Sequence, residues 1–474
     1  MAVDLPTVGG DAGEWGDLLN AALQNLDARP AADDATIAAV AADAGSDTRA
    51  ALSATYEALG TAASAVAPIA PDGGARAVGK GELMLNAADE GASPAASAAT
   101  NAAAFQAAID AAEAAGGGTV YIPAGVYSTN GITIDGGSVR LRGAGPAATV
   151  LQCSSGDLLT LGGAAAPSTR LVIDNLRLRS TSGGGHVIAV PYGLAQSRLD
   201  MLHLQQDNDA KSLFYCDRPV SGGGIFDVHF TDDYFLHKAT ATVPGVHIVG
   251  AGNACSANKW TRCRVQASGD FFFHIEAKNS GSYAQGNTFD TINFELCDGG
   301  GIRLVQALAT TIIAPQFHDN GTITKDCIQI NRGTTSSVQS RGTLVMGYSR
   351  SQGTLSGGAV DINLGAAAAN EASYTTIIGI TGPSTAGIAV NCFNSERVTI
   401  LGYDSGNVTI TSPSTGHATL VSADQGVTTP RIAHTGTALG FYGTTPIARP
   451  TLPAAGVVTA ADIRTALLAL GLCQ

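Results

Sequence analysis

Long charged and aromatic side chains are scarce in this sequence. Asp, Glu, Lys and Arg together make up 14% of the 474 residues, and aromatic residues make up 5%. Gly, in contrast, accounts for 59 of the 474 residues, which is well above its usual share of roughly 7%. This composition disfavours a charged helical bundle. It favours tight turns and close stacking around an aliphatic core, because 45% of the residues are hydrophobic.

Paired cysteines are also absent. The eight cysteines form no CxxC motif and no zinc-ligand spacing. Several lie in strand-like runs, such as the one around Cys263, where a small buried thiol stacks well. We therefore expect buried free thiols, folding in a reducing cytoplasm, and no metal site. Since GxSxG, P-loop and HExxH motifs are missing too, the sequence predicts no cofactor.

Nothing in the sequence predicts a membrane or nucleic-acid partner. The opening MAVDLPTVGGDAGEWGD lacks the basic and apolar regions of a secretory signal. No run approaches the roughly 18 uninterrupted apolar residues of a membrane span. The formal net charge of −13 disfavours a non-specific nucleic-acid binder, which needs a basic surface. If the protein acts outside a cell, we expect it to leave by lysis or within a particle.

The first 98 residues read as an attachment region. A short amphipathic helix is expected at 15–26, and such a helix needs a partner surface to be stable. The Ala-rich remainder of residues 1–66 fits either a thin helical stalk or a flexible linker. Residues 67–98 carry Pro, Gly and small polar residues and are expected to form a connector.

From residue 99 the pattern changes to a helix followed by short strands. Thr100-Asn101 gives a helix-capping signal, and Phe105, Ile109 and Ala112 share one helical face. After the triple Gly at 116–118, residues 119–127 alternate with a period of two, as a half-buried strand does. Further short strands are expected at 131–134, 138–141, 149–152 and 158–161.

The run NAAAFQAAIDAAEAAGGGTVYIPAGVY at 101–127, followed by GAGPAATVL at 143–151, resembles the opening of pectate-lyase-like right-handed parallel β-helix proteins. The resemblance covers about sixty residues and implies that the helix caps the open end of the strand stack. The fold class expected is therefore all-β, a single-stranded right-handed parallel β-helix over residues 99–423.

Strand-like runs recur through this region. Intervals of 35, 29, 23 and 31 residues separate Phe230, Val265, Phe294, Phe317 and Tyr348. Variable spacing is typical of β-helix coils, whose turns tolerate insertions while the strands stack. A β-sandwich would show more regular spacing and hairpin turns, so the β-helix is favoured.

Both ends of the chain resemble tail-associated proteins of phages and prophages. The motifs are LPTVGGDAGEWGDLLN at 5–20 and GFYGTTPIARP at 440–450, which precedes a short helix expected at 460–472. The resemblance implies a homotrimeric tail spike or tail fibre on the virion tail. Residues 1–66 would dock to a tail-tip or baseplate protein, and residues 424–474 would promote trimer closure.

Carboxylates recur near the strand ends of the predicted coils. Aligning the coils places the following residues in about the same turn: Asp232, Asp233, Asp270, Glu295, Asp298 and Asp319. One or two rungs separate such residues by about 5–10 Å, which spans the carboxylate separations of retaining and inverting glycosidases. Tyr234 and His318 stand beside this column. Arg303, together with Arg262 and Arg264, could neutralise uronate groups.

Each of these features also has a purely structural interpretation. Asp favours turns because its side chain caps nearby backbone amides, so a column of Asp is expected in any β-helix. Phe271, Phe272 and Phe273 could stack on sugars or fill the core. The GHG motif of polygalacturonases is missing, and Gly299–Arg303 stands where it is expected.

Three functions follow from the sequence. The first is a tail spike or fibre that recognises a host cell-surface glycan. The second is an active polysaccharide depolymerase, a hydrolase or a lyase, on the same spike, with Asp232, Asp233, Glu295, Asp298 and Asp319 as candidate catalytic residues. The third is a structural tail component without a ligand.

Overall fold

The computed structural model describes most of residues 82–403 and short pieces outside that range. The described residues are 76–78, 82–163, 167–218, 224–250, 255–277, 283–318, 320–331, 339–365, 372–382, 388–392, 395, 397–403, 408–411, 418–422, 438–439, 447–448 and 460–469. The predicted docking and stalk segment 1–66 lies outside them, as does most of the predicted C-terminal segment 424–474.

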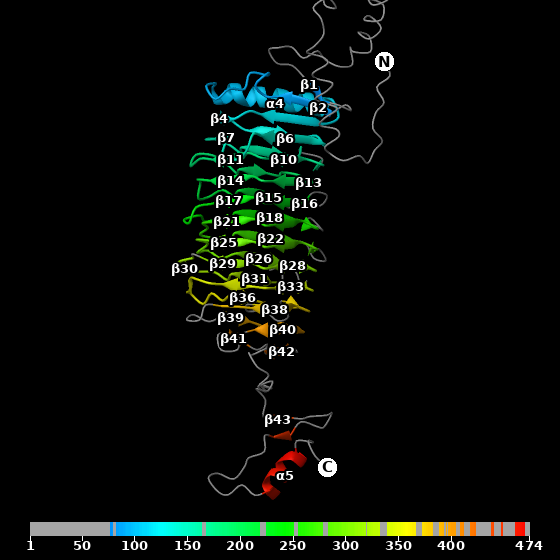
Figure 1. Cartoon of the computed structure of the whole chain (residues 1–474), viewed down its shortest axis with the longest axis vertical. Coiled ribbons are helices and arrows are strands. Elements are labelled where there is room, and N and C mark those ends of the chain that lie inside the picture. The colour runs from blue at the N-terminus through cyan, green and yellow to red at the C-terminus, as the bar shows by residue number, and fades with distance from the viewer. Residues whose placement is uncertain are drawn as a thin grey trace, which may run out of the picture. The chain divides into compact units, whose positions relative to one another are not determined.

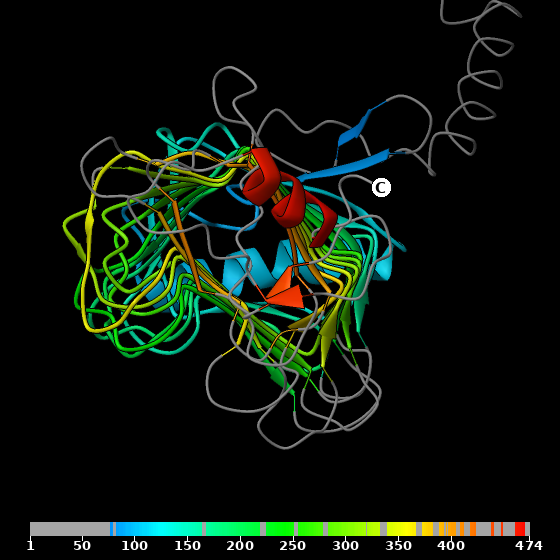
Figure 2. The same cartoon turned by 90° about the horizontal axis from the view of Figure 1, so that it is seen from below.

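The described residues form a parallel β-helix whose chain passes in turn through three sheets, called A, B and C (Figure 1). Seen along the axis, the strands of each sheet lie above one another (Figure 2). Sheet B consists of β4 (Gly125–Thr129), β7 (Thr149–Cys153), β11 (Arg177–Ser180), β14 (His203–Gln206), β17 (Tyr234–Leu236), β21 (Arg264–Gln266), β25 (Asn293–Glu295), β29 (Gln316–His318) and β34 (Ser349–Arg350).

Sheet C follows sheet B in each coil. It consists of β5 (Ile132–Ile134), β8 (Leu159–Leu161), β12 (Ile188–Ala189), β15 (Phe214–Arg218), β18 (Val246–Gly250), β22 (Phe273–Ala277), β26 (Ile302–Val305), β31 (Ile328–Asn331), β36 (Ile362–Asn363), β39 (Ile388–Asn391) and β41 (Val408–Thr411).

Sheet A completes each coil, in six coils as two short strands joined by a bend. It contains β2 (Glu82–Asn86), β3 (Gly118–Ile122), β6 (Val139–Gly143), β9 (Ser168–Thr169), β10 (Val172–Asp174), β13 (Leu194–Asp200), β16 (Ile225–Thr231), β19 (Cys255–Ser256), β20 (Lys259–Thr261), β23 (Ala284–Gln285), β24 (Thr288–Asp290), β27 (Ala307–Leu308), β28 (Thr311–Ile313), β32 (Ser340–Arg341), β33 (Leu344–Met346), β37 (Ala372–Ser373), β38 (Thr376–Ile380), β40 (Val398–Tyr403) and β42 (Ala418–Ser422).

A few elements lie outside these three sheets. They are the parallel pair β30 (Thr322–Ile323) and β35 (Thr354–Leu355), the antiparallel pair β43 (Ala438–Leu439) and β44 (Ile447–Ala448), and α5 (Ala460–Ala469). Strand β1 (Arg76–Val78) belongs to sheet A. The helix α5 confirms the helix expected at the end of the chain, over a shorter span. Strand β2 lies within the predicted connector 67–98 and pairs with β3, so strand pairing begins before residue 99.

The helix α4 (Ala98–Ala114) lies across the N-terminal end of the strand stack (Figure 2). Its buried face includes Phe105, Ile109 and Ala112, as the sequence predicts. The cap is Ser97, whose side chain accepts a hydrogen bond from the Thr100 amide, so the cap predicted at Thr100-Asn101 is wrong. The helix covers apolar side chains and strand edges that an open end would expose to water.

Aromatic rings inside sheet A align three successive coils. Phe230, Trp260 and Phe289 are register partners in β16, β20 and β24, and all three are fully buried. Trp260 stacks on Phe230 with ring centroids 5.4 Å apart and on Phe289 at 4.6 Å. Each such pair adds about 0.5–1.5 kcal/mol beyond the burial of its area. A shift of register would break both contacts.

The coil markers inferred from the sequence are partly wrong. Val265, Phe294 and Phe317 do occupy equivalent inward positions on successive strands of sheet B. Phe230, however, belongs to sheet A, and Tyr348 precedes β34 rather than lying in it. Only the intervals of 29 and 23 residues, between Val265, Phe294 and Phe317, therefore measure the length of a coil.

The residue in register with Phe317 is Arg350, which is an unusual residue for a β-helix core. Its side chain is 1% exposed and pairs with the fully buried Asp361, with Nε 2.5 Å from Oδ1. The same carboxylate oxygen accepts a hydrogen bond from the Tyr348 hydroxyl at 2.6 Å. Arg350 also donates from Nη1 to the Gly353 carbonyl at 2.6 Å. Because every charge has a partner, the pair is tolerated inside the core.

Removing one member of this pair should be strongly destabilising. Arg350→Met leaves the Asp361 carboxylate buried without its cation, so we expect a loss of about 3–5 kcal/mol in unfolding free energy. The double variant with Asp361→Asn should recover part of that loss. Urea denaturation checks both, with Arg262→Met, which breaks an exposed pair, as a control that should cost at most about 1 kcal/mol. Equal losses for Arg350→Met and the control would contradict the expectation.

Candidate functional site

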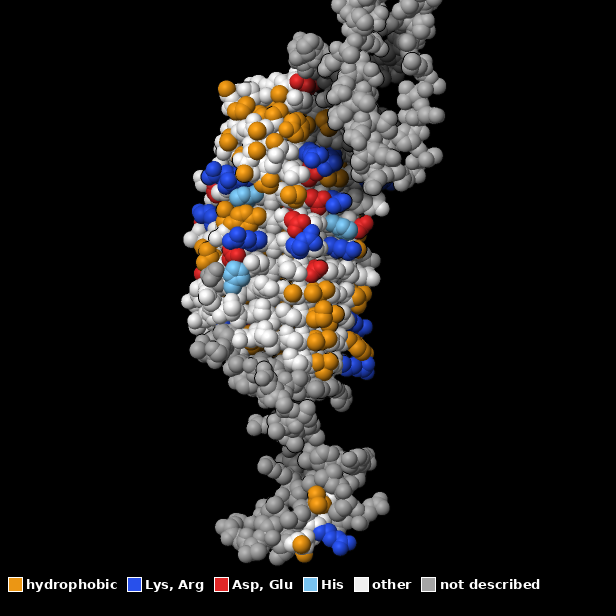
Figure 3. All heavy atoms as spheres, in the orientation of Figure 1, with side chains coloured by type: hydrophobic (Ala, Val, Ile, Leu, Met, Phe, Trp, Pro, Cys, Tyr) orange, Lys and Arg blue, Asp and Glu red, His pale blue; other side chains and the backbone are white. Residues whose placement is uncertain are grey.

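The outer surface of sheet B, called the sheet B face, carries several of the residues predicted from the sequence. Strand alternation turns two columns of side chains outward. The first column is Arg177, His203, Tyr234, Arg264, Asn293 and Gln316, and the second is Arg179, Gln205, Leu236, Gln266, Glu295 and His318. Charged and His side chains gather over β11 to β29 on this side of the molecule (Figure 3).

Glu295 is the predicted carboxylate that lies on this face. Its side chain is 10% exposed, and its Oε2 lies 2.5 Å from Arg264 Nη2. The other oxygen, Oε1, accepts a hydrogen bond from Asn293 at 3.3 Å and lies 3.3 Å from His318 Nε2. Hydrogen bonding to Glu295 raises the pKa of Arg264. Both carboxylate oxygens thus hold neighbouring side chains in place.

Tyr234 lies between two side chains of the same column. Its ring centroid is 4.6 Å from that of His203, and the Arg264 guanidinium carbon lies 5.3 Å from it on the next rung. The hydroxyl donates to Gln266, and burial is the main cause that raises the pKa of Tyr234. Burial, assisted by the Arg177 charge, lowers the pKa of His203 to about 4. This column therefore presents a neutral imidazole and a neutral phenol at neutral pH.

The two predicted aspartates 232 and 233 lie at the corner between sheets A and B. Asp232 has a left-handed backbone, with φ of 55°, and its carboxylate makes two hydrogen bonds of 2.7 Å with Arg262. The hydrogen bond from Arg262 lowers the pKa of Asp232. Asp233 points the other way and is 1% exposed, and its Oδ1 accepts a hydrogen bond from the Leu202 amide at 2.8 Å. Burial raises the pKa of Asp233 well above its ordinary value.

The remaining predicted residues lie elsewhere. Asp298, in a turn between sheets B and C, accepts a hydrogen bond from the Gly321 amide at 3.0 Å. Asp270 occupies the turn one coil earlier and pairs with Lys325. Arg303 lies on sheet C, and Asp319 is outside the described residues. The predicted single column is therefore divided between the A–B corner, the sheet B face and the B–C turns.

This division weakens the predicted carboxylate chemistry. In the described part of the chain, no hydrogen bond is found between any two of the predicted carboxyl groups. Asp232 and Glu295 each have an arginine partner, whereas Asp233 and Asp298 accept from backbone amides. Hydrolysis of a glycosidic bond by two carboxylates requires that both face the same bond. Their catalytic roles stay predictions.

The outer surface of sheet C, called the sheet C face, escaped the sequence analysis. One outward column carries a ring, a guanidinium or an amide on every rung over seven strands. In register order these residues are Tyr215, His247, His274, Arg303, Gln329, Asn363 and Asn391. They lie on separate coils, and no short motif joins them.

The rings at the upper end of this column touch one another. His186 stacks on Tyr215 with centroids 4.0 Å apart, Tyr215 lies 5.3 Å from His247, and His247 lies 5.3 Å from His274. Burial lowers the pKa of His186 to about 4, so that its ring is neutral at neutral pH. The exposed fraction of the His274 side chain is 14%, so neighbouring groups cover most of its ring.

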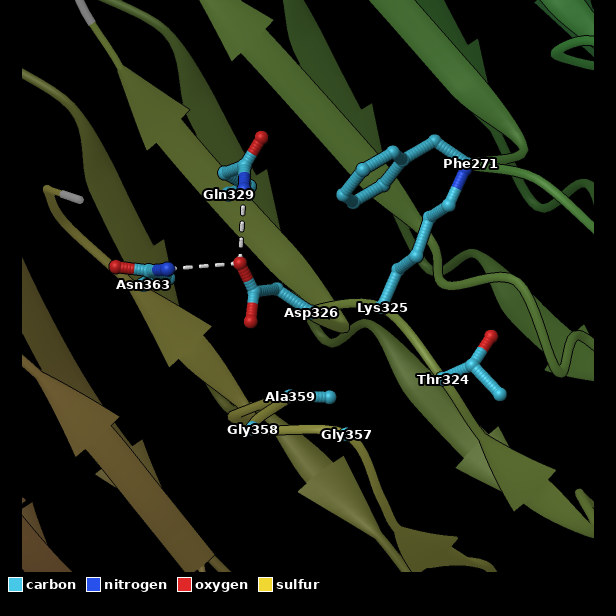
Figure 4. Close-up of a pocket in the computed structure, with 9 residues that line it drawn as sticks. All are labelled: Phe271, Thr324, Lys325, Asp326, Gln329, Gly357, Gly358, Ala359 and Asn363. Atoms are coloured by element: carbon cyan, nitrogen blue, oxygen red, sulfur yellow. Dashed lines mark hydrogen bonds between the residues drawn. The ribbon is translucent and has the colours of Figure 1, made fainter. Parts of the chain in front are cut away.

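A polar hollow adjoins the lower end of the column (Figure 4). It is open to solvent, has a volume of about 200 Å³ and is lined by Phe271, Thr324, Lys325, Asp326, Gln329, Gly357, Gly358, Ala359 and Asn363. Asp326 Oδ2 accepts hydrogen bonds from the amides of Gln329 at 2.9 Å and Asn363 at 2.8 Å, which fixes both amide groups. The Lys325 ammonium lies 5.6 Å from the Phe271 ring centroid.

The adjoining phenylalanines serve the core. Phe272 and Phe273 are fully buried, so the structural interpretation of those two rings is confirmed, and Phe271 is 6% exposed.

All seven cysteines in the described part of the chain are buried free thiols. Among the described residues, no group of three or more His, Cys, Asp or Glu side chains is placed to hold a metal ion. No helix in that part of the chain is both long and apolar enough to cross a membrane.

Comparisons with known proteins reveal likeness of fold. No protein-family model and no curated protein matches the chain. Among solved structures, it is similar to ORF18 of Geobacillus virus E2, at 14% identity and a TM-score of 0.48, over 72% of this chain and 61% of that one. It is also similar to the A-module of Azotobacter vinelandii mannuronan C-5 epimerase AlgE6, at 17% identity and a TM-score of 0.41, over 72% of this chain and 100% of that one.

A tailspike shows the same level of likeness. Tailspike protein 2 of bacteriophage CBA120, in its enzymatically active domain, is 12% identical with a TM-score of 0.44, over 74% of this chain and 54% of that one. The chain thus spans about three-fifths of the length of the Geobacillus virus protein and about half of the tailspike. Structural neighbours of this parallel β-helix therefore include phage tailspikes and polysaccharide-active enzymes.

The raised pKa of Asp233 leads to a prediction. A carboxyl whose pKa is raised by folding contributes stability below its unfolded pKa of about 3.9, and that contribution is lost as the pH rises through the folded value. Asp233→Asn keeps an acceptor for the Leu202 amide and removes the buried charge. We expect it to raise the melting temperature at pH 8 and to change it little at pH 4.

The exposed neighbour supplies a control of opposite sign. The pKa of Asp232 is lowered, so its contribution is present at neutral pH. Asp232→Asn should therefore lower the melting temperature slightly at pH 8. Calorimetry at both pH values measures the two effects, and a destabilised Asp233→Asn variant at pH 8 would refute the buried-acid interpretation.

Proposed function

We propose that the chain is a tail spike or tail fibre of a phage or prophage, and that it recognises a host cell-surface glycan on the sheet C face. The motifs at 5–20 and 440–450, which resemble tail-associated proteins, support the first part. The column from Tyr215 to Asn391 and the hollow beside it support the second part.

One observation carries the glycan proposal: the column places one ring or polar side chain on every rung. Rungs of a parallel sheet repeat at about 4.8 Å, so the column offers evenly spaced contacts to an extended chain of sugars. Flat rings pack against the apolar faces of sugars, and oriented amides hydrogen-bond to hydroxyl groups. Gln329 and Asn363 are already held by Asp326, which reduces the entropy lost on binding.

Acidic side chains lie beside two of the basic side chains at this face, whereas Arg303 lies over the Phe271 ring. Lys325 pairs with Asp270 at the hollow, and His274 lies 3.1 Å from Glu276. A face with balanced charges suits a glycan that is read mainly through hydroxyl groups and ring faces. The competing hypothesis is a structural tail component without a ligand. A measurement of glycan binding distinguishes it from the glycan-recognition proposal.

Binding to an array of purified bacterial O-polysaccharides and capsular polysaccharides tests the proposal. We expect the intact chain to bind at least one of them, and Tyr215→Ala and Asn363→Ala each to weaken that binding about tenfold, since a lost ring contact or a pair of hydrogen bonds is worth about 1.4 kcal/mol. Thr160→Ala, on the same face above the rings, should leave the affinity unchanged.

Variants of the predicted sheet B residues are measured for polysaccharide binding in the same experiment. Glu295→Gln and Tyr234→Ala alter the sheet B face without touching sheet C. Weakening by these two variants alone would move the glycan site to the sheet B face and support the sequence prediction. Absence of binding to every polysaccharide, measured also with whole bacterial cells, would reject glycan recognition.

A homotrimer on the virion tail is the assembly that we propose for this function. Sheet A supports it, because an outward column of apolar side chains runs along its C-terminal half. Ile313, Met346, Ile378 and Leu401 are register partners, and the exposed fraction of Met346 is 37%. Apolar side chains gather over β28, β33 and β38 in Figure 3. Parallel copies of the chain would cover such a stripe.

Charged substitutions in that stripe should dissociate the trimer. We expect the intact chain to show three times its monomer mass in light scattering, and Met346→Lys combined with Ile378→Lys to shift the mass toward the monomer. Thr160→Lys, on sheet C, is the matched control and should leave the mass unchanged. A monomeric intact chain would contradict the proposed assembly.

For attachment to the virion, we propose that residues 1–66 dock to a tail-tip or baseplate protein.

A further inference from the structure

Nine successive coils pass through sheet A in a frame of the same width. In each of them, two residues with a left-handed backbone enclose four residues, and the φ angles of these enclosing residues lie between 46° and 68°. We call the first residue of each pair the bend edge and the second the corner edge. The pairs are Arg170 and Asn175, Gln196 and Met201, Asp227 and Asp232, Ala257 and Arg262, Gly286 and Thr291, Ala309 and Ala314, Gly342 and Gly347, Tyr374 and Gly379, and Arg397 and Gly402. Because strand side chains alternate, each frame presents two outward side chains between its edges.

In the last coils the two edges differ in shape. The corner edge there consists of Gly347, Gly379 and Gly402, and a Cβ atom placed on any of them would contact only the corner-edge residue of the preceding coil, no closer than 3.7 Å. This edge is therefore bare and open on its outer side. On the bend edge, Tyr374 is 51% exposed, and the guanidinium carbon of Arg397 lies 4.7 Å from its ring centroid. The bend edge thus projects in coils whose corner edge is bare.

The outward side chains between the edges, which we call the sheet A face, also differ in charge from one side to the other. Over β13 to β24, the column beside the bend edge is Arg198, His229, Lys259 and Thr288, and the column beside the corner edge is Asp200, Thr231, Thr261 and Asp290. Arg198 pairs with Asp200 at 2.8 Å within the chain. Among the described residues, in contrast, no ion pair involves Lys259 or Asp290. One side of this face is therefore basic and the other acidic.

The two sides of the sheet A face complement each other in shape and in charge. An unrelated partner would need to match only one side, whereas a second copy of the chain carries both halves of the contact. A contact between two different surfaces of identical chains closes into a ring when the rotation from copy to copy divides a full turn. If the axis of that ring is parallel to the β-helix, equal coils meet at the same level. The complementarity therefore favours a second copy as the occupant of this face.

We infer that the bend edge of each copy packs against the corner edge of the next, with the three sheet A faces turned toward a common axis, an inference that rests on the homotrimer proposed above. Tyr374 then covers Gly379 of the next copy. Lys259 lies beside Asp290 of the next copy, because a lysine side chain spans the roughly 4.8 Å between neighbouring rungs. Exposed Tyr and Arg side chains are frequent anchors of interfaces, so Tyr374, held by Arg397, is the anchor of this contact.

Disulfide cross-linking tests the contact between the edges. Arg397 and Leu401 lie four residues apart on one strand, about 13 Å, which is too far for a disulfide within one chain. The test variant combines Arg397→Cys and Leu401→Cys with Cys473→Ser, and the seven other cysteines are buried. We expect mild oxidation to give a covalent trimer on a non-reducing denaturing gel. Each variant with only one of the two new cysteines should remain a monomer on that gel.

The other products have definite meanings. A covalent dimer from either single-cysteine variant shows that like edges meet, and it overturns the inference. A closed covalent dimer from the double-cysteine variant shows a ring of two copies and overturns it as well. A trimer in light scattering that forms no cross-link overturns the contact between the edges and leaves the proposed assembly intact, whereas a monomer in light scattering rejects both.

Truncation of the anchor tests the same contact through affinity. Tyr374→Ala should raise the concentration at which half of the trimer dissociates at least about tenfold, as the loss of an interface anchor does. Val126→Ala is the matched control, because Val126 is also 51% exposed but lies on sheet B. It should leave that concentration unchanged. Equal effects of the two variants would contradict the role of Tyr374.

A charge exchange tests the ionic part of the contact. Lys259→Glu and Asp290→Lys should each raise the concentration of half-dissociation about threefold, since exposed ion pairs contribute little individually. The variant that carries both substitutions should return to the value of the unaltered chain, because it restores a pair of opposite charges between copies. Effects that add in the double variant would show that the two side chains do not meet.

Discussion

Register between parallel strands is the constraint on which the rest of this structure depends. Each coil is held to its neighbours by strand pairing and by inward side chains that stack on the equivalent residues above and below. The stack of Phe230, Trp260 and Phe289 shows how specific this is, because two ring contacts of 5.4 and 4.6 Å form only in one register. Since strand side chains alternate, a slip of one residue would turn an entire row of core residues toward water.

The same register builds the outer surfaces. Once Phe273 faces inward, its neighbour His274 must face outward, and it then lies beside His247 on one side and Arg303 on the other. Columns such as the sheet B face and the sheet C face are therefore a direct consequence of core stacking. Functional side chains gain fixed positions without any dedicated loop, because the core that holds them is closely packed.

The two faces differ in what their side chains already do. On the sheet B face, Glu295 engages Arg264, Asn293 and His318, so much of its polar capacity is used within the protein. On the sheet C face, stacked rings and amides held by Asp326 lie beside a hollow that is open to solvent. That contrast, rather than the number of charged residues, makes sheet C the better candidate for a glycan.

Short-range patterns in the sequence are enough to predict the strands and the capping helix. The alternation of apolar residues predicted the strands near 131–134, 138–141, 149–152 and 158–161, which appear as β5, β6, β7 and β8. It also placed Phe105 and Ile109 on the buried face of the capping helix. These features depend on neighbours one to four residues away, so the local sequence is sufficient. Ser97 was missed as the cap because Thr100-Asn101 offered the same chemistry three residues later.

What the sequence could not determine is which residues of different coils become neighbours. The turns vary in length, so equal positions on successive rungs lie at unequal intervals in the chain. For that reason Phe230 was wrongly used as a coil marker equivalent to Val265. Asp233 and Asp232 are adjacent in sequence, yet the left-handed backbone at 232 turns one outward and the other into the core. The sequence by itself therefore determined that this chain coils into a capped, aliphatic strand stack. Only the tertiary structure decided that the rings of Tyr215, His247 and His274 lie beside one another, because their contact depends on the register of three separate coils.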